Sequence, residues 1–342
     1  MKRILVMSLA TAVFTLISTA SLIAQEVAGP AALRPAATRL VETIKGPEAV
    51  VSSVRFGGPD GRLAAGYFNN LVEVWDAAGK TPVELKGHEN WVTAVAWDLQ
   101  TGLLASAGLD KKILLWKLPA TEPQKTLGGH DQWIRALAIS RDGKTLVSAG
   151  DDNLVKVWDL ESGELRHTFS GHGDWVMAVA ISPHGDVAAS GSLDGTIRLW
   201  NLADGKEGRV IQAEGQRVLS LAFDPYGTLL ASGGADRTVR LWDVASGSPG
   251  KSLVGHTDQV LGLAFHPGGR LAASASADGT VRIWDLATGA SLNTLEGHNQ
   301  WVWSVDFSLD GRQLASAGAD ETIRLWDLTG SAAPPGEAQA AK

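Results

Sequence analysis

Residues 255–285 read GHTDQVLGLAFHPGGRLAASASADGTVRIWD. Three short runs within this stretch, at 260–265, 271–275 and 280–285, are rich in apolar, alternating or β-branched residues, which is typical of β-strands. Residues that favour tight turns separate the runs, including an Asp-Gly pair at 278–279. The stretch therefore predicts a three-stranded meander that has Gly-His before its first strand and Trp-Asp at its end.

The same unit recurs along the chain with an almost constant period. Its closing tryptophan occurs seven times, with one spacing of 41 residues and five of 42, at Trp75, Trp116, Trp158, Trp200, Trp242, Trp284 and Trp326. A fourth strand is predicted after each Trp, beyond a glycine turn, as in residues 164–169. A fixed period of about 20 to 50 residues indicates a repeat architecture. Four short antiparallel strands per unit make one blade of a β-propeller.

The units resemble those of the WD-repeat family, which carry Gly-His near their start and Trp-Asp at their end. The Gly-His pairs stand at Gly87-His88, Gly129-His130, Gly171-His172, Gly255-His256 and Gly297-His298. The resemblance covers residues 38–328. It implies an all-β fold, a single seven-bladed β-propeller of four-stranded antiparallel blades.

Two units depart from this pattern. The first has Gly46-Pro47 where Gly-His is expected, with Ala65 and Asn69 in place of the usual Ser and Asp. The fifth has Ala213-Glu214 instead of Gly-His. We expect the first blade to be the loosest of the seven and the fifth to be the next loosest.

The two ends of the repeat region predict how the ring closes. Residues 40–45 match the outer, fourth strand of a blade, whereas nothing that resembles a strand follows Leu328. The N-terminal strand is therefore expected to complete the last blade, so that no sheet edge is left unfinished. Residues 25–37 are interpreted as a linker, and residues 329–342, rich in Ala, Gly and Pro, as a disordered tail.

Residues 1–24 have the organisation of a secretory signal peptide. A positively charged start precedes an apolar run, and the small residues Ala20 and Ala24 offer two cleavage sites. The alternative is an uncleaved membrane anchor, because residues 4–23 approach the ~20 apolar residues that a spanning helix needs. The Ser and Thr content of the run favours cleavage. We therefore expect an exported protein, periplasmic or secreted, with no stable membrane insertion after signal cleavage.

The composition argues against several classes of function. The chain of 342 residues is 44% hydrophobic and 20% charged, which is typical of a folded globular protein. Its net charge of −7 argues against nucleic acid as a partner, because non-specific DNA binding requires a dense Lys and Arg surface. The chain has no Cys, and so has no disulfide, thiolate metal ligand or cysteine nucleophile.

Each regular unit contains a Ser, a His and an Asp, which are the residue types of a hydrolase triad. The trio recurs in five units, whereas an enzyme needs one site, and no nucleophile-elbow sequence surrounds these serines. The resemblance implies instead that each trio joins its blade Trp in a buried structural hydrogen-bond set. The expected sets are His88, Ser106, Asp110 and Trp116; His130, Ser148, Asp152 and Trp158; His172, Ser190, Asp194 and Trp200; His256, Ser274, Asp278 and Trp284; and His298, Ser316, Asp320 and Trp326.

No other pattern in the sequence points to catalysis or to a cofactor. The eight His residues are scattered, with no His-x-x-Glu-His motif or clustered carboxylates that would suggest a metal site. A phosphate-binding Gly-x-x-x-x-Gly-Lys motif is also absent. We therefore expect no enzymatic activity, no metal and no cofactor.

The candidate partner-binding residues lie in and just after the loops that enter the innermost strand of each blade. Three residues after each Gly-His histidine, the aligned column contains Val50, Trp91, Trp133, Trp175, Arg217, Gln259 and Trp301, and two residues later it contains Ser52, Thr93, Arg135, Met177, Leu219, Leu261 and Trp303. These loops lie on one face of a propeller, and Trp, Arg and Met are enriched at interfaces. The predicted partner-binding residues are Trp91, Trp133, Arg135, Trp175, Met177, Arg217, Gln259, Trp301 and Trp303.

A purely structural alternative is that these Trp side chains cover the mouth of the channel or pack between blades. That alternative predicts a Trp in every blade, but Arg217 and Gln259 replace it in the fifth and sixth. The sequence thus favours a non-enzymatic interaction scaffold, a monomeric propeller that binds a protein or peptide on its Trp-rich rim. The second hypothesis is a propeller lectin or small-ligand-binding protein that uses the same Trp residues.

Overall fold

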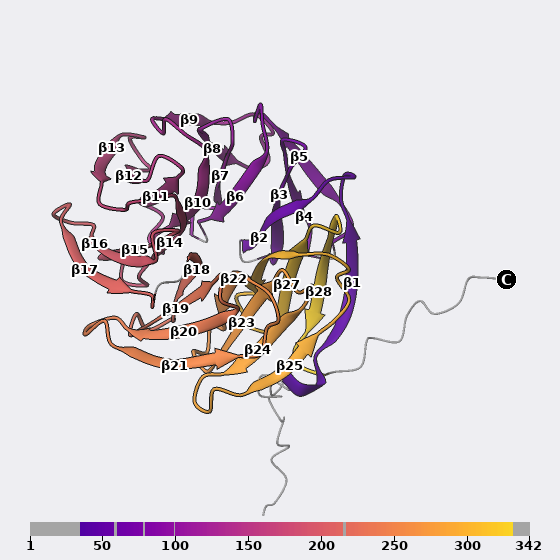
Figure 1. The fold of residues 1–342 in the computed structure, drawn as a ribbon. Coiled ribbons are helices and arrows are strands. Elements are labelled where there is room, and N and C mark those ends of the chain that lie inside the picture. Colours follow the sequence, from indigo (N-terminus) through magenta and orange to yellow (C-terminus); the bar gives the residue numbers. More distant parts are fainter. Residues whose placement is uncertain (1–34, 58–59, 78, 99, 215–216, 331–342) are drawn as a thin grey trace, which may run out of the picture. The chain divides into compact units, whose positions relative to one another are not determined.

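The computed structural model describes residues 35–330, apart from 58–59, 78, 99 and 215–216. These residues form one short 3-10 helix, η1 (Pro35–Ala37), and β-strands joined by turns and loops. The strands make seven four-stranded antiparallel sheets that follow one another around a central axis (Figure 1). The seven-bladed, all-β propeller expected from the sequence is therefore confirmed. The predicted signal peptide (1–24), most of the predicted linker (25–37) and the tail beyond residue 330 lie outside the described residues.

In blades 1 to 6 the strands follow chain order from the innermost to the outermost. Blade 1 contains β2 (Val51–Gly57), β3 (Arg62–Tyr67), β4 (Leu71–Trp75) and β5 (Pro82–Lys86), and blade 2 contains β6 (Val92–Trp97), β7 (Leu103–Gly108), β8 (Lys112–Lys117) and β9 (Lys125–Gly128). Blade 3 contains β10 (Ile134–Ile139), β11 (Thr145–Gly150), β12 (Val155–Asp159) and β13 (Leu165–Phe169), and blade 4 contains β14 (Val176–Ile181), β15 (Val187–Ser192), β16 (Thr196–Asn201) and β17 (Glu207–Gln212). Blade 5 contains β18 (Val218–Phe223), β19 (Leu229–Gly234), β20 (Thr238–Asp243) and β21 (Pro249–Val254), and blade 6 contains β22 (Val260–Phe265), β23 (Leu271–Ser276), β24 (Val281–Asp285) and β25 (Ser291–Leu295).

Blade 7 joins the two ends of the repeat region. Its inner three strands are β26 (Val302–Phe307), β27 (Gln313–Gly318) and β28 (Thr322–Asp327), and its outermost strand is β1 (Arg39–Lys45). Strand β1 pairs with β28 antiparallel along its whole length, from Arg39 opposite Asp327 to Lys45 opposite Thr322. The expected closure by the N-terminal strand is confirmed, and blade 7 is completed by residues nearly 300 positions apart in the sequence.

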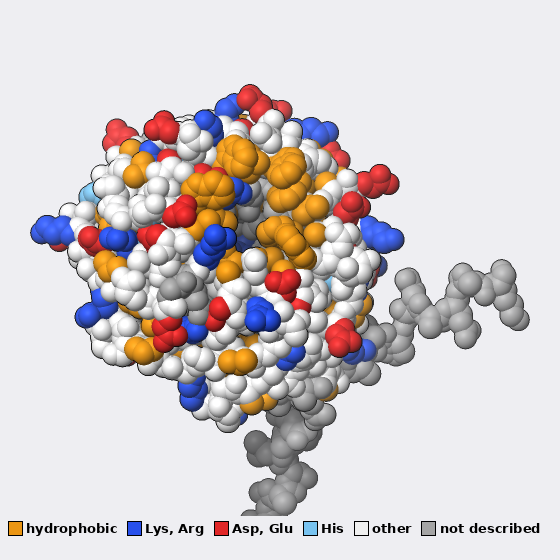
Figure 2. All heavy atoms as spheres, in the orientation of Figure 1, with side chains coloured by type: hydrophobic (Ala, Val, Ile, Leu, Met, Phe, Trp, Pro, Cys, Tyr) orange, Lys and Arg blue, Asp and Glu red, His pale blue; other side chains and the backbone are white. Residues whose placement is uncertain are grey.

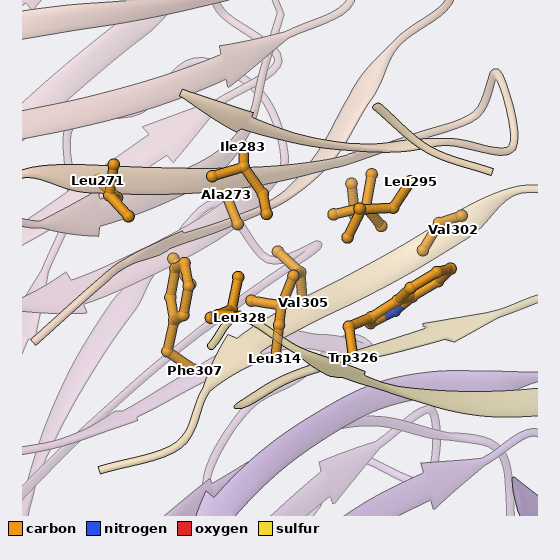
Figure 3. Packing of buried hydrophobic residues seen from close by; sticks show 13 residues of the cluster. Leu271, Ala273, Ile283, Leu295, Val302, Val305, Phe307, Leu314, Trp326 and Leu328 are labelled. Carbon is orange, nitrogen blue, oxygen red and sulfur yellow. The ribbon is translucent and has the colours of Figure 1, made fainter. Parts of the chain in front are cut away.

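Each blade interface holds one cluster of buried hydrophobic residues. Figure 3 shows the cluster between blades 6 and 7, where Ile283 and Leu295 lie near Val302, Val305 and Trp326. Burying a side chain of this kind contributes roughly 1.5–3 kcal/mol relative to leaving it exposed. Since each cluster draws on two neighbouring blades, no blade completes its core alone, and the ring depends on every blade being in place.

The innermost strand of every blade carries a β-bulge near its start. In blade 3, for example, Ile134 pairs with Gly150 and Ala136 with Ala149, so Arg135 is the extra residue. A bulge leaves one residue outside the regular pairing and redirects its side chain. The bulged residues are those of the second column defined from the sequence: Ser52, Thr93, Arg135, Met177, Leu219, Leu261 and Trp303.

Within the residues that the structure describes, no helix has the length and hydrophobicity needed to cross a membrane.

Candidate functional site

Five blades contain the complete Ser, His, Asp and Trp hydrogen-bond set. In blade 2, His88 Nδ1 lies 2.8 Å from Asp110 Oδ2, His88 Nε2 lies 2.7 Å from Ser106 Oγ, and Trp116 Nε1 donates to Ser106 Oγ at 2.8 Å. The corresponding distances in blades 3, 4, 6 and 7 are all between 2.7 and 2.9 Å. An indole N–H can only donate, so the Ser hydroxyl accepts from Trp and donates to His Nε2, while His Nδ1–H donates to Asp. Each set therefore links the loop before the blade, its second strand, its turn and its third strand.

The serines in these sets cannot act as nucleophiles in this arrangement. All five, at positions 106, 148, 190, 274 and 316, have 0% exposure, and an indole N–H already occupies each hydroxyl oxygen. A reacting substrate atom would have to approach to about 3–3.5 Å. Because each hydroxyl is fully buried and already bonded to an indole, the geometry supports a structural role for each set.

The carboxylates of these sets are held in their ionised form. Burial alone would raise the pKa of Asp194, but hydrogen bonds from the Gly173 N–H, Thr196 and His172 outweigh it and lower the pKa to about 2. The pKa of Asp320 is likewise lowered to about 2, because hydrogen bonds from His298 and Thr322 outweigh its burial. A folded-state pKa below the unfolded one stabilises the protein above pH ~4, and this contribution is lost as the pH falls toward the folded value.

Blade 5 keeps part of the set. Trp242 Nε1 donates to Ser232 Oγ at 2.8 Å, but no His is available because Ala213-Glu214 replaces Gly-His. Arg240 instead contacts Glu214 at 3.2 Å and Asp236 at 2.9 Å. An ion-pair group thus ties the loop to the turn where the other blades use His and Asp.

Blade 1 replaces the set with a different buried group. Trp75 Nε1 donates to the Tyr67 hydroxyl at 3.3 Å, and Tyr67 is fully buried. A Cβ at Gly46 would lie 2.6 Å from the Tyr67 hydroxyl, so glycine is required there for this tyrosine to fit. The looseness expected of blades 1 and 5 stays a prediction. In blade 1, the Tyr67 hydroxyl accepts the hydrogen bond from the blade Trp that a Ser accepts in the regular blades.

A carboxyl group is buried beside this tyrosine. Glu73 is only 3% exposed, and its Oε2 has no hydrogen-bond partner among the described residues. Burial raises the pKa of Glu73, and the Glu84 charge on the neighbouring strand raises it further. Burial and the Glu73 charge also raise the pKa of Tyr67 above its usual value. Blade 1 therefore contains an electrostatic cost that the regular blades do not have.

The first predicted column forms an exposed rim on one face of the propeller. Trp91, Trp133, Trp175 and Trp301 are 46%, 41%, 42% and 51% exposed, respectively. Backbone hydrogen bonds fix the loops that carry them: the Leu109 N–H donates to the Trp91 carbonyl, for example, at 2.9 Å. Figure 2 shows hydrophobic side chains gathered around the central opening, more densely above blades 1, 2, 3 and 7 than above blades 5 and 6. Arg217 and Gln259, at the rim of blades 5 and 6, are exposed as well.

The second predicted column lines the central cavity, which has a volume of about 220 Å³. Arg135, Met177 and Trp303 belong to this lining, together with Ser52 and Thr93. The Ser52 hydroxyl donates to the Val92 carbonyl of blade 2 at 2.7 Å, and the Thr93 hydroxyl donates to the Ile134 carbonyl of blade 3 at 2.6 Å. Ser52 and Thr93 therefore hold neighbouring blades together.

Arg135 is already engaged within the protein. Its guanidinium makes two 2.7 Å hydrogen bonds to the Asp151 carboxylate and lies 5.1 Å from the Trp133 ring centroid and 5.4 Å from that of Trp175. We call these four residues the arginine clamp. Two of the predicted Trp anchors thus have an internal partner, and Asp151 is not among the residues predicted for this surface.

The remaining aromatic residues form a second group, which we call the aromatic wall: Phe68, Trp91, Trp301 and Trp303. Phe68 stacks on Trp91 with a centroid distance of 4.4 Å and lies 6.3 Å from Trp303, and Trp303 meets Trp301 edge to face at 5.5 Å. The sequence analysis missed Phe68. It precedes the turn residue of blade 1, and the aligned column, Phe68, Leu109, Asp151, Leu193, Ala235, Ala277 and Ala319, would have marked both Phe68 and Asp151 as unusual.

A pocket of about 610 Å³ lies beside this wall. Its lining includes Phe68, Trp301 and Trp303, Asn299 and Gln300, and the turn 277–279 of blade 6. Among the described residues, no group of three or more His, Asp or Glu side chains is placed to hold a metal ion.

Comparison with known proteins identifies the repeat. The family model described as "WD domain, G-beta repeat" matches residues 79–117, 121–159, 163–201, 205–243, 247–285 and 289–327. The chain belongs to the WD-repeat family. The inner three strands of blade 1 of this WD-repeat protein lie outside the matched segments, where Tyr67 and Glu73 replace the usual hydrogen-bond set.

Individual relatives match this WD-repeat protein over short stretches. Protein transport protein SEC13 of Yarrowia lipolytica is 38% identical over 72 residues, which is 19% of this chain and 24% of that protein. The ribosome biogenesis protein WDR12 homolog of Anopheles gambiae is 38% identical over 61 residues, or 17% of this chain and 14% of that protein. Mitochondrial division protein 1 of Schizosaccharomyces pombe is 32% identical over 80 residues, or 23% of this chain and 12% of that protein. The matches span less than a third of each relative.

Proposed function

We propose that this WD-repeat protein is a non-enzymatic scaffold that binds a protein or peptide through its Trp-bearing face. Propellers of this family typically serve as protein-interaction scaffolds and are generally not enzymes. The observation that carries the proposal is the exposure of Trp91, Trp133, Trp175 and Trp301 by 41–51% on one face. Contiguous exposed apolar surface marks interaction sites, and Trp is enriched among the residues that dominate binding energy.

The structure of the rim supports this proposal in a second way. The rim side chains lie on loops pinned by backbone hydrogen bonds, and ring contacts and the arginine clamp hold several of them in place. A surface that is already ordered loses less conformational entropy when a partner binds. The rim also differs from blade to blade, so it can select one orientation of a partner.

Position-specific photo-crosslinking tests the proposal. A benzophenone amino acid at Gln300 lies in the pocket lining of the Trp-bearing face, whereas the same group at Tyr226 lies in the β18–β19 turn on the opposite face. We expect a discrete adduct with a protein from Gln300 and none from Tyr226 in cells that make the protein. Adducts of equal yield from both positions, or from Tyr226 alone, would place the binding face elsewhere.

A glycan is the second candidate ligand. Asn299 and Gln300 line the pocket beside Trp301, and sugars combine an apolar ring face with hydroxyl groups that amides can bind. A glycan array separates the two candidates. Saturable binding to one glycan class that is lost in Trp301→Ala, without any protein adduct from Gln300, would favour the lectin.

We further propose that the protein is exported to the periplasm or the medium. The support is the sequence of residues 1–24, with its basic start, apolar run and small residues before the two candidate cleavage sites. Cell fractionation with an N-terminal measurement on the isolated protein tests this proposal.

A further inference from the structure

The pocket beside Trp301 owes its space to small residues in one aligned column. The residue that precedes the turn Asp or Asn is Leu109 in blade 2 and Leu193 in blade 4, but Ala277 in blade 6 and Ala319 in blade 7. Both alanines line the pocket of about 610 Å³. The pocket is therefore open because blades 6 and 7 have alanine at this position, where blades 2 and 4 have leucine.

Three aromatic side chains line this pocket, and none of the described residues in its lining is Lys or Arg. Trp301, Trp303 and Phe68 line it, and Trp301 is 51% exposed. In the arginine clamp, by contrast, Arg135 already lies over two indole rings. The faces of aromatic rings carry partial negative charge and attract cations.

The surroundings of the pocket are anionic. The loops of blades 6, 7 and 1 on this face, 255–259, 277–280, 296–301, 319–321, 46–50 and 68–70, contain Glu48, Asp258, Asp278, Glu296, Asp320 and Glu321 and no Lys or Arg. The basic residues Lys45, Arg282 and Arg324 of these blades lie on strands and do not line the pocket. The guanidinium groups of Arg282 and Arg324 lie near Gly255 and Gly297 of these loops, and Arg324 lies 3.7 Å from Asp320.

Asp278 is one of the residues that line the pocket, and its side chain is 6% exposed. Burial alone would raise its pKa, but hydrogen bonds from His256, the Thr257 N–H and Thr280 hold the pKa well below its usual value. The described residues that line the pocket include no Lys or Arg to balance this charge. A charge at the edge of a partly enclosed pocket is less screened than one on open surface.

We propose that this pocket binds a basic side chain, Lys or Arg, of the partner protein or peptide. The arginine clamp shows the matching chemistry within the same rim, where a guanidinium is held by indole rings and a carboxylate. In the pocket, Trp301 and Trp303 supply the rings, and Asp278 with the anionic loops supplies the charge. The inference rests on the proposed function, because it names the part of the partner that the Trp-bearing face recognises.

Titration with small probes tests this assignment without knowledge of the partner. The indole N–H signals of the ¹⁵N-labelled protein are followed by NMR while N-acetyl-arginine amide, N-acetyl-lysine amide or N-acetyl-glutamine amide is added. The Trp301 and Trp303 signals are assigned from the single variants Trp301→Phe and Trp303→Phe. We expect saturable shifts at these two signals with the basic amides, with dissociation constants at least tenfold lower than that of the glutamine amide.

Matched variants show whether the probe enters this pocket. Ala319→Leu and Ala277→Leu fill it with a side chain that blades 2 and 4 accept at the same position, whereas Ala235→Leu makes the same change in blade 5, outside the pocket lining. We expect the shifts to disappear in the first two variants and to persist in the third. If either pocket variant fails to fold, the other still gives the answer.

Three outcomes would overturn the assignment. Equal affinity for the glutamine amide would show that the charge is not recognised. Persistence of the shifts in the folded pocket variants would place the probe elsewhere, and absence of any saturable shift would show that the pocket does not bind a basic side chain. None of these results would remove a Gln300 photo-adduct with a protein. The crosslinking experiment therefore tests the proposed function independently of the titration.

Discussion

At the scale of single residues, burial distinguishes a structural role from a chemical one. Ser274, His256 and Asp278 have the order and distances of a hydrolytic triad, with 2.7 Å and 2.8 Å between successive side chains. The Trp284 indole N–H occupies the Ser274 hydroxyl, however, and Ser274 is fully buried. In an open cleft, these side chains could activate the Ser hydroxyl as a nucleophile. Here they are buried and provide hydrogen-bond partners for one another.

We expect Ser274→Ala to lower the free energy of unfolding by roughly 1–3 kcal/mol, because it leaves the Trp284 indole and His256 without a partner in the protein interior. Ser148→Ala in blade 3 is the matched change and should cost about the same. Urea unfolding monitored by circular dichroism measures both. A variant that lost an enzymatic activity while keeping the stability of the parent protein would contradict the structural role.

Glu73 gives the opposite dependence on pH from the Asp residues. Its pKa in the folded protein is raised above the ordinary value of 4.5. With respect to Glu73, the folded protein is therefore most stable at acid pH, where this residue is protonated, and it loses stability as the pH rises through the folded-state pKa. Glu73→Gln removes this loss. The melting temperature of the variant should therefore exceed that of the parent protein by an amount that grows as the pH rises from 4.5 toward the folded-state pKa. A difference that stays constant as the pH rises above 4.5 would show that the pKa of Glu73 is not raised in the folded protein.

At the scale of strands and blades, the closure of the ring depends on β1. This strand pairs with β28 over its full length, and Ile44 on it belongs to the cluster between blades 7 and 1. Loss of β1 would expose the edge of β28 and would open this cluster at the same time. Because the blade interfaces share their cores, the effect should spread around the ring.

We therefore expect deletion of residues 38–45 to abolish the single cooperative unfolding transition or to lower its midpoint strongly. Deletion of residues 331–342 removes no described strand and should change the midpoint little. Differential scanning calorimetry of both truncated proteins measures the contrast. Small and equal effects of the two deletions would show that the N-terminal strand is dispensable for closure.

Sequence periodicity was sufficient to predict the architecture but not the details of the irregular blade. The Trp spacing, the Gly-His pairs and the strand-like residues 40–45 predicted seven blades and their closure, because these features repeat or complete a repeat. The pairing of Tyr67 with Trp75 could not be predicted from the pattern. It depends on the space that Gly46 leaves, and that space exists only in the folded blade.

At the scale of the whole molecule, the two sides of the rim have different roles. Above blades 3 and 4 the arginine clamp is internally complete, whereas above blades 6, 7 and 1 the aromatic wall borders a pocket. The two predicted columns contain six of the eight side chains of the clamp and the wall. They do not contain Asp151 and Phe68, whose contacts with Arg135 and Trp91 join different parts of the fold. Only the structure shows which Trp residues have an internal partner.

The N-terminal residue of the mature protein tests the proposed export. If residues 1–20 or 1–24 are removed as a signal peptide, the mature protein begins at Ser21 or Gln25. Intact-mass spectrometry of protein isolated from the periplasm or medium should give one of these two masses. A membrane-bound form that retains Met1 would mean that the segment is an anchor.

The exposed Trp residues make the central claim measurable. Trp301 is an exposed residue of the aromatic wall. Trp301→Ala should therefore weaken capture of the crosslinked partner by about 2 kcal/mol or more if Trp301 is an anchor. Trp133→Ala should also weaken capture to that extent if the clamp belongs to the interface, whereas Tyr226→Ala, which removes a 61% exposed ring on the opposite face, should have no effect.

The most direct measurement is the dissociation constant of the isolated partner, determined by calorimetry for the parent protein, Trp301→Ala and Tyr226→Ala, together with the melting temperature of each. We predict a loss of affinity of about 30-fold or more for Trp301→Ala, which corresponds to about 2 kcal/mol, with a nearly unchanged melting temperature. A large fall in the melting temperature of Trp301→Ala with unaltered affinity would contradict the account, since it would make the rim Trp a packing element and place recognition on another surface of the propeller.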